Sequence, residues 1–421
     1  MLSLRPQAHA QCEPSATALP SAIAALPSLA SQARPFTNLE RQARIERARE
    51  LMAAHNIDAI ILANDATSAV YFANLRLGSS ERLWALVIPA KGRPFVICPA
   101  FEEGRAEELL ARGPFGKDAD VLTWQEDEDP FALAIRGLRD RGITSGNVGL
   151  DEEMKFIFSD SLAKAAPALH FVSAVPVTAG CRMIKSQHEL DCMALACHAT
   201  LLVYRAIYES LKEGMTTADV ERLVDQGYQR VGFRGEASLN IGEYTALPHG
   251  SDQVQIIREG TILMLDDGCE VEGYTSDITR TFVLGKATDK MKRVFDIVKS
   301  AQSAGLAAAR PGAPLAAADA AARKVITDAG YGPGFKYFSH RLGHGIGMDM
   351  HEWSYLVKNN MFGWERNPVM QANMVFSDEP GIYIKGEFGI RLEDDMHITE
   401  DGAKLFTPQS PSLEDPFGNV S

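Results

Sequence analysis

Acidic residues in the segment "LDDGCEVEGYTSDITRTF" have the spacing of a charged site on a β-hairpin. The surrounding residues suit a sheet, and a hairpin with its tip near Val271 to Gly273 would set Asp266 roughly opposite Asp277. Directly opposed residues have Cβ atoms about 5 Å apart, where like charges are destabilising. A cation between the two strands would remove that repulsion.

A second segment, "SDEPGIYIKGEFGIRLEDD", repeats the arrangement. Gly386 lies midway between Glu379 and Glu393, so a hairpin that turns at this glycine would bring the two carboxylates face to face. A single acid on a hairpin is usually solvated and carries no function. Two hairpins that each oppose acid to acid instead predict a shared cationic centre, because the repulsion on both would otherwise be uncompensated.

Histidines occupy the stretch between the two hairpins. In "HRLGHGIGMDMHE", His340, His344 and His351 stand among glycines, which allow close approach of the backbone. A lone histidine is more often structural than a ligand. Four carboxylates together with imidazole nevertheless match the ligands of a site for two divalent ions about 3.5 to 4 Å apart, in which carboxylates bridge the pair.

These segments resemble, in the same order, the metal-site motifs of the pita-bread metallopeptidases (family M24), which include Xaa-Pro aminopeptidase, prolidase (Xaa-Pro dipeptidase) and methionine aminopeptidase. The resemblance rests on "LDDGCEVEGYTSDITRTF", "HRLGHGIGMDMHE", "SDEPGIY" and "GIRLEDD", and it covers about residues 180 to 410. The preceding residues resemble, more loosely, the amino-terminal domain of creatinase and prolidase. That additional domain and the wording of the motifs favour the proline-specific branch over methionine aminopeptidase.

The resemblance implies a complete set of ligands for a dinuclear centre. Asp277 and Glu393 would bridge both ions, and Asp266 would chelate one of them. His344 and Glu379 would complete the second. Glu379 would also be the general base toward a bridging water, whose pKa two Lewis-acidic ions would lower enough to give hydroxide near neutral pH. Mn²⁺ is the expected metal because the ligands are mostly carboxylates, with Co²⁺, Zn²⁺ and Fe²⁺ as alternatives.

The resemblance also implies side chains that act on the substrate. His351 and His249, the latter in "LPHGSD", resemble the histidines that contact the scissile carbonyl or the leaving nitrogen. His340 resembles a residue of the substrate pocket. Arg391 and Tyr383 resemble groups that orient the ligands and stabilise the tetrahedral intermediate, a function that usually matters almost as much as ligation itself.

The sequence departs from the family pattern at two places. Trp353, Ser354 and Tyr355 follow "MHE" where relatives commonly have prolines, which changes the expected shape of the substrate pocket. Asp378 precedes the predicted base where an apolar residue is usual, which alters the polarity around it. Asp267 is expected on the opposite face of its strand, away from the metals. Three further acids are expected to be surface or structural residues: Asp349, Asp394 and Asp395.

The elements expected around these motifs divide the chain into a leader and two domains. Residues 1–34 are rich in Ala, Ser, Pro and Leu, which predicts a disordered leader, with an imperfect export signal as the alternative. Residues 35–177 alternate helical and short apolar strand patterns, which predicts a smaller α/β domain. Residues 178–421 combine strand and turn signals with long helices, including two at about 290–310 and 315–329, so an α+β catalytic domain is expected, with a pita-bread fold by the resemblance.

Length and composition fit this division and argue against several partners. A chain of 421 residues is too long for one ordinary hydrophobic core. A formal net charge of -13 leaves no basic surplus to neutralise nucleic acid or anionic lipid. No apolar run approaches the roughly 18 residues of a membrane span. We expect a cytoplasmic protein, exported only if residues 1–34 act as a signal, and a homodimer, as is usual in the family that it resembles.

The predicted activity is hydrolysis of the Xaa-Pro bond of dipeptides or of short peptide amino-termini by a dinuclear metallopeptidase. Metal hydroxide would attack the carbonyl, and the departing proline nitrogen would be protonated through a histidine relay. A non-peptidase hydrolase or a lyase on the same scaffold would keep the metals and change the pocket, and the altered segment at 353–355 leaves room for either. The complete ligand set disfavours a metal-free binding module.

Overall fold

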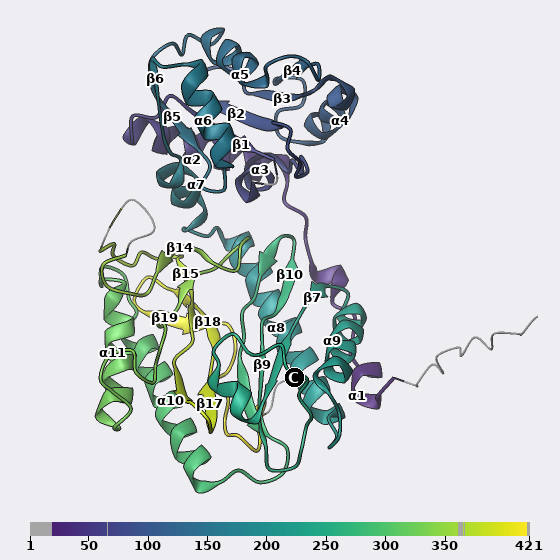
Figure 1. The fold of residues 1–421 in the computed structure, drawn as a ribbon, viewed down its shortest axis with the longest axis vertical. Helices are drawn as coiled ribbons and strands as arrows, with labels where there is room; N and C mark the ends of the chain where they lie inside the picture. The colour runs from purple at the N-terminus through teal and green to yellow at the C-terminus, as the bar shows by residue number, and fades with distance from the viewer. Residues whose placement is uncertain (1–18, 65, 361–364, 366, 419–421) are drawn as a thin grey trace, which may run out of the picture.

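The chain folds into two domains that lie one above the other in Figure 1. The computed structural model describes residues 19–64, 66–360, 365 and 367–418. The upper domain is a mixed α/β unit, and the lower domain is a larger α+β unit that contains all of the acidic and histidine motifs. This order confirms the predicted fold class.

The first domain is a three-layer unit around one six-stranded sheet. Its strands are β1 (Ala59–Ala63), β2 (Ala85–Pro89), β3 (Phe95–Pro99), β4 (Asp120–Trp124), β5 (Gly146–Leu150) and β6 (Leu169–Ser173). They lie in the order β4-β3-β2-β1-β5-β6. The pairs β1–β2 and β2–β3 are antiparallel, and the other pairs are parallel. Alternate side chains of β1 enter the two cores on either side of the sheet, Ile60 and Leu62 on one side and Ile61 on the other.

Helices cover both faces of this sheet. One core includes side chains of α2 (Asn38–Ala54), α3 (Thr67–Ala73), α4 (Glu103–Arg112) and α7 (Val175–Arg182), and the other includes α5 (Pro130–Arg139) and α6 (Phe156–Ala165). The short, fully apolar strands are therefore buried on both sides, as their sequence pattern predicted.

The second domain places its strands between two pairs of helices. Helix α8 (Gln187–Ser210) packs on α9 (Thr217–Val231), and α10 (Asp289–Ala308) packs on α11 (Ala316–Asp328). Figure 1 shows these pairs on opposite sides of the strands, and each pair contributes to its own apolar core. The helices predicted at 290–310 and 315–329 are confirmed to within two residues at each end.

The strands of the second domain form short sheets whose edges meet at the site. The sheets have the orders β12-β9-β8, β14-β13-β15-β18-β19, β11-β10-β7 and β16-β17. Their strands are β7 (Arg234–Gly235), β8 (Ser238–Ile241), β9 (Ile262–Asp266), β10 (Cys269–Val271), β11 (Tyr274–Thr275), β12 (Arg280–Val283), β13 (His344–Gly345), β14 (Glu352–Tyr355), β15 (Val375–Asp378), β16 (Gly381–Ile384), β17 (Phe388–Arg391), β18 (Asp394–Ile398) and β19 (Ala403–Leu405).

Residues 19–34 do not form the predicted disordered leader. Helix α1 (Ser21–Ala24) lies against α8 and α9, and Ile23, Leu26 and Leu29 are buried in the core of the second domain. Prolines interrupt this segment, so it is too short between them to show a helical period, although its apolar residues still bury. Residues 1–18 lie outside the described part of the chain.

The domain boundary lies a few residues after the predicted position 177. Helix α7 packs on α2, and its Val177 and Cys181 belong to the core of the first domain. Helix α8 begins after a capping box in which the Ser186 hydroxyl accepts a hydrogen bond from the Glu189 N–H. The chain therefore passes between the domains twice, once just before α2 and once at the short stretch 183–186.

Helix α8 is the one helix in the described part of the chain that has the length and apolar composition to cross a membrane, which the sequence pattern did not predict. Within its most apolar window, 67% of the residues are buried inside the protein. That burial is typical of a core helix, and both neighbouring helices and strands pack on it.

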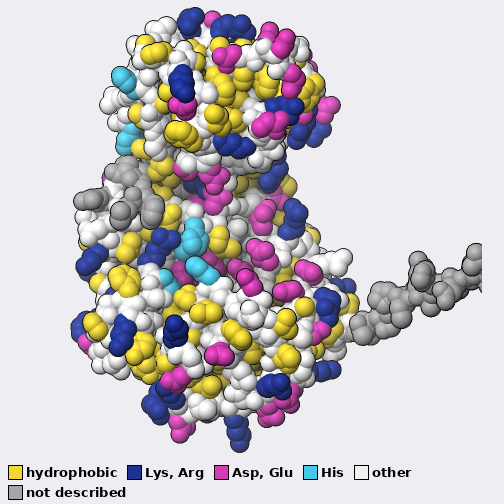
Figure 2. All heavy atoms as spheres, in the orientation of Figure 1, with side chains coloured by type: hydrophobic (Ala, Val, Ile, Leu, Met, Phe, Trp, Pro, Cys, Tyr) yellow, Lys and Arg dark blue, Asp and Glu magenta, His cyan; other side chains and the backbone are white. Residues whose placement is uncertain are grey.

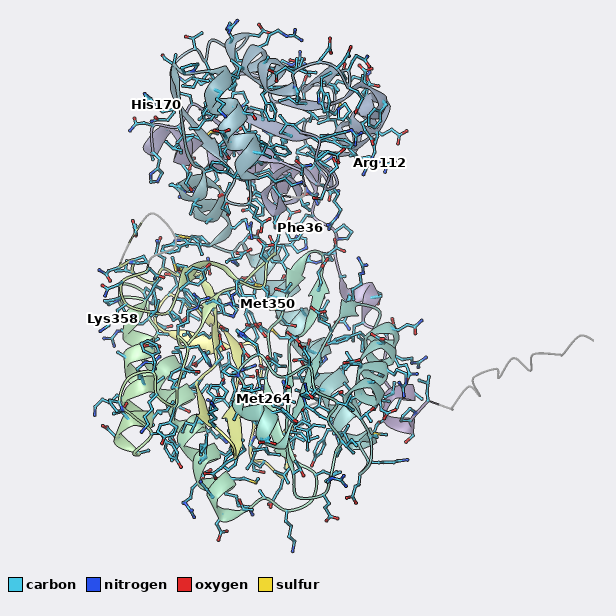
Figure 3. The ribbon with its side chains drawn as sticks, in the orientation of Figure 1. Phe36, Arg112, His170, Met264, Met350 and Lys358 are labelled. Atoms are coloured by element: carbon cyan, nitrogen blue, oxygen red, sulfur yellow. The ribbon has the colours of Figure 1, made fainter. Side chains whose placement is uncertain are left out.

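A buried ion pair also joins the two domains. Phe36 lies at their junction in Figure 3, with its ring 5.4 Å from that of Tyr274 and 4.4 Å from the guanidinium of Arg44. Arg44 on α2 pairs at 2.8 Å with Glu189 on α8, and both side chains are largely buried. Because removal of either partner would leave a buried charge, this pair ties the position of the first domain to the start of α8.

Candidate metal centre

A cavity of about 500 Å³ in the second domain brings the predicted site residues together. All of them except Tyr383 line it: His249, Asp266, Asp277, His340, His344, His351, Glu379, Arg391 and Glu393. Figure 2 shows histidine and acidic side chains gathered in a hollow of this domain, just below its junction with the first. The side chains come from four separate stretches of sequence that the fold brings to one place: 249, 266–277, 340–351 and 379–393.

The first hairpin has its tip where the sequence predicted it, but its register differs by two residues. Strands β10 and β11 pair Val271 with Tyr274, so Glu272 and Gly273 form the turn, and both have positive φ. The same register pairs Leu265 with Arg280, which places Asp266 opposite Thr279 and not opposite Asp277. A shift of two residues keeps Asp277 on the same face, so the two carboxylates still reach one cavity.

The second hairpin has the predicted register. Strands β15 and β18 pair Asp378 with Asp394, and β16 and β17 pair Gly381 with Arg391, so Glu379 lies opposite Glu393 where the two ladders meet. Both glutamates are thus held at a break between two strand pairs. Both residues line the cavity, where the charge of Glu379 acts on Glu393.

Asp277, His344 and Glu393 form the tightest group of donor atoms. One ligand atom of each lies within 4.8 Å of the others, and all three residues are buried. His344 Nε2 also lies 3.4 Å from Glu379 Oε1 and 3.5 Å from Asp277 Oδ2. The His344 Nδ1 lies 3.1 Å from the Gly345 carbonyl, which can only accept, so Nδ1 carries a proton and Nε2 is the atom available to a metal ion.

The electrostatics of this group fit a cation. Burial, together with Asp277 and Asp266, raises the pKa of Glu379 to about 7 against the lowering effects of His344 and Arg391. Burial and the charges of Asp277 and Glu379 raise the pKa of Glu393 well above its usual range. Carboxylates that resist ionisation in one another's presence become stable anions when a divalent ion lies between them. The residues present therefore fit the implied ions.

Thr279 is a site residue that the sequence did not indicate. Its hydroxyl lies 2.6 Å from Glu393 Oε2, also contacts the carboxylate of Asp266, and accepts a hydrogen bond from Arg391 Nε at 2.9 Å. Arg391 in turn forms an ion pair with Asp266. Thr279 lies one residue before β12, and only the register that sets it opposite Asp266 reveals this function, because a single threonine carries no sequence signal of its own.

Tyr383 and Arg391 form hydrogen bonds that can fix the orientation of neighbouring site residues. The Tyr383 hydroxyl lies 2.7 Å from His340 Nε2 and accepts a hydrogen bond from Arg391 Nη1 at 3.1 Å. His340 Nδ1 faces the Arg341 carbonyl at 2.8 Å and therefore donates, which leaves Nε2 to accept from Tyr383. Burial and the charge of Arg391 lower the pKa of His340 to about 3, so this ring is neutral at neutral pH.

His351 lies at the edge of the metal cavity. Its ring stacks on that of His344 with centroids 3.8 Å apart, and Arg341 Nη2 lies 3.4 Å from its Nδ1. Burial and the neighbouring His344 lower the pKa of His351 to about 4. His351 is thus a neutral imidazole beside the predicted ligands.

Asp267 lines the same cavity, contrary to the prediction from strand alternation. Its φ of 97° leaves the extended region, so its side chain does not follow the alternation of β9. Its carboxylate accepts a hydrogen bond from the Ser238 N–H at 3.1 Å. Burial and then Asp266 raise the pKa of Asp267 to about 7.

The acids that flank the second hairpin are buried structural residues and not surface ones. Asp394 forms an ion pair with Arg280 at 2.7 Å, and Asp395 accepts a hydrogen bond from the backbone N–H of Asp277 at 3.0 Å. Both are buried, and these contacts hold the strands that carry the predicted ligands. Asp378 is also fully buried, and neither carboxylate oxygen has a hydrogen-bond partner in the described part of the chain. Burial, and then the charges of Asp394 and Glu379, raise the pKa of Asp378 well above its usual range.

Comparison with known proteins places this geometry in a family. The model of metallopeptidase family M24 matches residues 191–400, and that of the creatinase/prolidase N-terminal domain matches residues 44–184. An Xaa-Pro dipeptidase of Lactobacillus delbrueckii subsp. lactis is 31% identical over 358 residues, which cover 83% of this chain and 92% of the relative. The chain belongs to metallopeptidase family M24.

Solved structures of similar proteins agree with the family M24 assignment. Dipeptidase PepE from Mycobacterium ulcerans has a TM-score of 0.82 and 30% identity, over 90% of this chain and 99% of that chain. A prolidase from Thermococcus sibiricus has a TM-score of 0.77 and 27% identity, over 87% and 96%.

These similarities establish the class of enzyme. The chain is a peptidase hydrolase of a family that depends on a dinuclear metal centre, and its buried Asp277, His344 and Glu393 fit metal binding. The predicted family, fold and enzyme class are confirmed. A peptidase is thereby favoured over the non-peptidase hydrolase and the lyase that the sequence left open.

Proposed function

We propose that this chain hydrolyses the Xaa-Pro bond of dipeptides or of short peptide amino-termini. The observation that carries the proposal is the convergence of buried carboxylates and imidazoles on one cavity, with Glu379 and Glu393 face to face. The preference for proline rests on the relatives, which include an Xaa-Pro dipeptidase and a prolidase.

Five residues would hold two divalent ions in this proposal. They are Asp266, Asp277, His344, Glu379 and Glu393, all of which line the cavity. The ions, when bound, would supply Lewis acidity toward the carbonyl and lower the pKa of water. Mn²⁺ is the proposed metal because four of the five ligands are carboxylates, with Co²⁺, Zn²⁺ and Fe²⁺ as alternatives.

The chain's own side chains would orient the substrate and move protons. Glu379 would accept the proton of the attacking water, since its carboxylate lies in the cavity between His344 and Arg391. His351 and His249 would contact the scissile carbonyl and the leaving nitrogen. His340 would bind substrate, with its ring fixed by the hydrogen bond from Tyr383.

Release of free proline tests this function. The chelated protein would be incubated with an Xaa-Pro dipeptide and with a tripeptide that begins Xaa-Pro, before and after addition of Mn²⁺. Metal-dependent cleavage of the dipeptide alone is the result expected of a prolidase, and cleavage of both is the result expected of an aminopeptidase P. Cleavage of neither by the metal-loaded protein would contradict the proposal.

The proposed enzyme is a cytoplasmic homodimer. This proposal follows the family resemblance, and the neighbouring subunit would then lie near the substrate cavity. A solution mass of two chains in light scattering would agree with it, and a mass of one chain would contradict it.

A further inference from the structure

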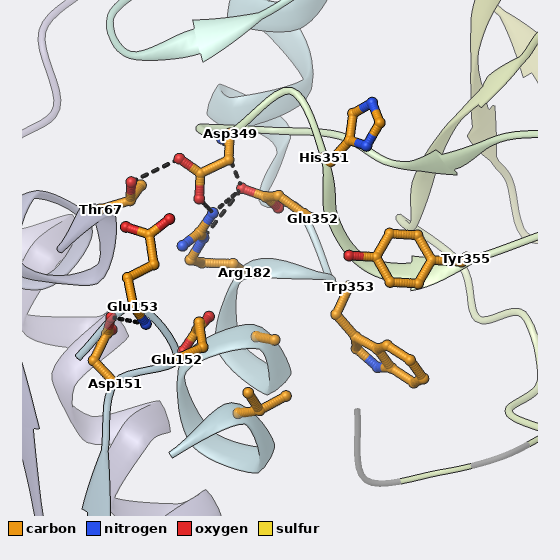
Figure 4. A pocket seen from close by; sticks show the side chains of 12 residues that line it. Thr67, Asp151, Glu152, Glu153, Arg182, Asp349, His351, Glu352, Trp353 and Tyr355 are labelled. Atoms are coloured by element: carbon orange, nitrogen blue, oxygen red, sulfur yellow. Dashed lines mark hydrogen bonds and ion pairs between the residues drawn. The ribbon is translucent and has the colours of Figure 1, made fainter. Parts of the chain in front are cut away.

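A second cavity of about 270 Å³ lies between the two domains and adjoins the metal centre. His351 lines both cavities, so the two hollows meet at this side chain. Figure 4 shows the wall of the second cavity, with Glu152 and Glu153 of the first domain on one side and Trp353 and Tyr355 of β14 on the other. A group bound at His351 would therefore border both cavities.

The carboxylates from the first domain have no cationic partner in the described part of the chain. Asp151 is only 5% exposed, lines the cavity, and has one oxygen that accepts a hydrogen bond from the Glu153 N–H at 3.1 Å. Glu152 accepts from the Thr178 hydroxyl at 2.9 Å, and the Glu153 carboxylate has no hydrogen bond or ion pair among the described residues. Three acids thus line one cavity without an ion pair among the described residues, although the charge of Arg182 acts on Asp151 and Glu153 from a distance.

The acids on the opposite wall are neutralised. Glu352 pairs with Arg182 and, at 3.0 Å, with Lys185, and Asp349 pairs with Arg182 while it accepts a hydrogen bond from Thr67. Figure 4 shows this network behind the cavity. The ion pairs of Arg182 and Lys185 are therefore made with Glu352 and Asp349 and not with Asp151, Glu152 or Glu153.

Two of these acids have raised pKa values, which a bound cation would lower. Burial and the neighbouring Glu152 raise the pKa of Asp151 to about 7, and burial and then Asp349 raise the pKa of Glu153. A positive charge placed among them would favour their ionised forms.

Part of the cavity wall is apolar. It includes Val175 and Ala179 of α7 and the indole of Trp353, which is 7% exposed. A long aliphatic chain with a cation at its end matches this wall, because lysine and arginine lay their methylene groups on apolar surface and keep the charged end near polar groups.

We propose that this cavity receives the side chain of the residue that precedes the proline, and that it selects lysine or arginine at that position. The aliphatic part of the side chain lies along Val175, Ala179 and Trp353, and its cation pairs with Glu152 and Glu153. The inference rests on the proposed Xaa-Pro activity and adds the substrate class to it.

Two dipeptides of equal length test the inference: lysyl-proline and norleucyl-proline, whose side chain lacks only the amino group. The Mn²⁺-loaded wild-type protein should show a kcat/KM for lysyl-proline at least about tenfold higher, the ratio that corresponds to about 1.4 kcal/mol. The double variant Glu152→Gln, Glu153→Gln should bring the two values close together and leave the rate for norleucyl-proline nearly unchanged. Glu153 has no side-chain bond to lose, so the single variant Glu153→Gln provides a check if the double variant is unstable.

The control variant is Glu107→Gln, which removes the same charge from the exposed surface of α4 and should keep the wild-type ratio. Equal kcat/KM for both dipeptides in the wild-type protein would overturn this inference and leave the proposed function intact. A preference for lysyl-proline that persists in the double variant would also overturn it. Cleavage of neither dipeptide would overturn the proposed function, and this inference with it.

Discussion

Replacement of Thr279 by valine removes one hydroxyl from the metal centre and keeps the shape of the side chain. The hydroxyl is fully buried, lies 2.6 Å from Glu393 Oε2, and accepts from Arg391 Nε at 2.9 Å. Without it, the Arg391 Nε–H loses its partner in a place closed to water. A buried donor left unsatisfied costs about 1–3 kcal/mol, so we expect the variant to be destabilised by that amount.

The same substitution should also weaken metal binding. Partners that orient ligands typically change metal affinity or activity about 10–100-fold when they are removed, and Thr279 contacts two predicted ligands, Asp266 and Glu393. Titration of the chelated protein with Mn²⁺ in a calorimeter would measure this loss of affinity. Thermal unfolding of the same samples would measure the stability.

Thr281→Val is the matched control for this experiment. Thr281 is equally buried two residues further along the chain, in β12. It donates to the Arg391 carbonyl at 2.6 Å and accepts the Arg391 N–H at 3.2 Å, and neither of these bonds involves a carboxylate. We expect a similar loss of stability and an unchanged Mn²⁺ affinity. Wild-type affinity in Thr279→Val, or an equal loss in both variants, would refute the argument that Thr279 orients the ligands.

Three further outcomes follow from the same geometry. Glu379→Gln should lower kcat for an Xaa-Pro dipeptide about 10²–10⁴-fold if Glu379 is the base, and a rate within about threefold of wild type would exclude that function. Burial raises the pKa of Glu379 from 4.5 to about 7, so in the chelated protein this carboxyl lowers stability increasingly as the pH rises from 4.5 to 7. The Tm of Glu379→Gln minus that of wild type should therefore increase as the pH rises from 4.5 to 7. A difference that stays constant over this range would contradict the raised pKa of Glu379. Tyr383→Phe removes the donor to His340 and an acceptor from Arg391, so kcat/KM should fall about tenfold with Mn²⁺ content unchanged, whereas an unchanged kcat/KM would show that this hydroxyl does not orient the site.

The sequence predicted one hairpin better than the other for a physical reason. Glu379 and Glu393 are equally far in sequence from Gly386, which has a positive φ and lies at the turn. A turn at this glycine was therefore enough to predict that the two glutamates lie opposite each other. In the first hairpin the turn consists of Glu272 and Gly273, and glutamate is not a residue that signals positive φ. The register was therefore set two residues away.

The groups that support the ligands could not be predicted, because they depend on how distant strands meet. Thr279 contacts Glu393 from a position 114 residues away in sequence, and Asp395 accepts the N–H of Asp277 across 118 residues. Such contacts leave no local pattern. Asp267 was misplaced for a local reason, since its positive φ breaks the strand alternation that the prediction assumed.

The burial of residues 19–34 shows the limit of composition as a guide. A segment rich in Ala, Ser and Pro resembles a leader, yet Ile23, Leu26 and Leu29 supply enough apolar surface to pack on α8 and α9. Whether the segment is ordered depends on the apolar surface of α8 and α9, which the sequence of the segment itself does not encode.

The metal content of the purified chain tests the central claim most directly. After incubation with Mn²⁺ and removal of free metal, elemental analysis should find about two ions per chain in the wild-type protein, as expected of a dinuclear site. The variant Asp277→Asn, which alters a predicted bridging ligand, should lose at least one of them while it remains folded by circular dichroism. Two ions in both proteins, or none in either, would contradict the metal centre described here.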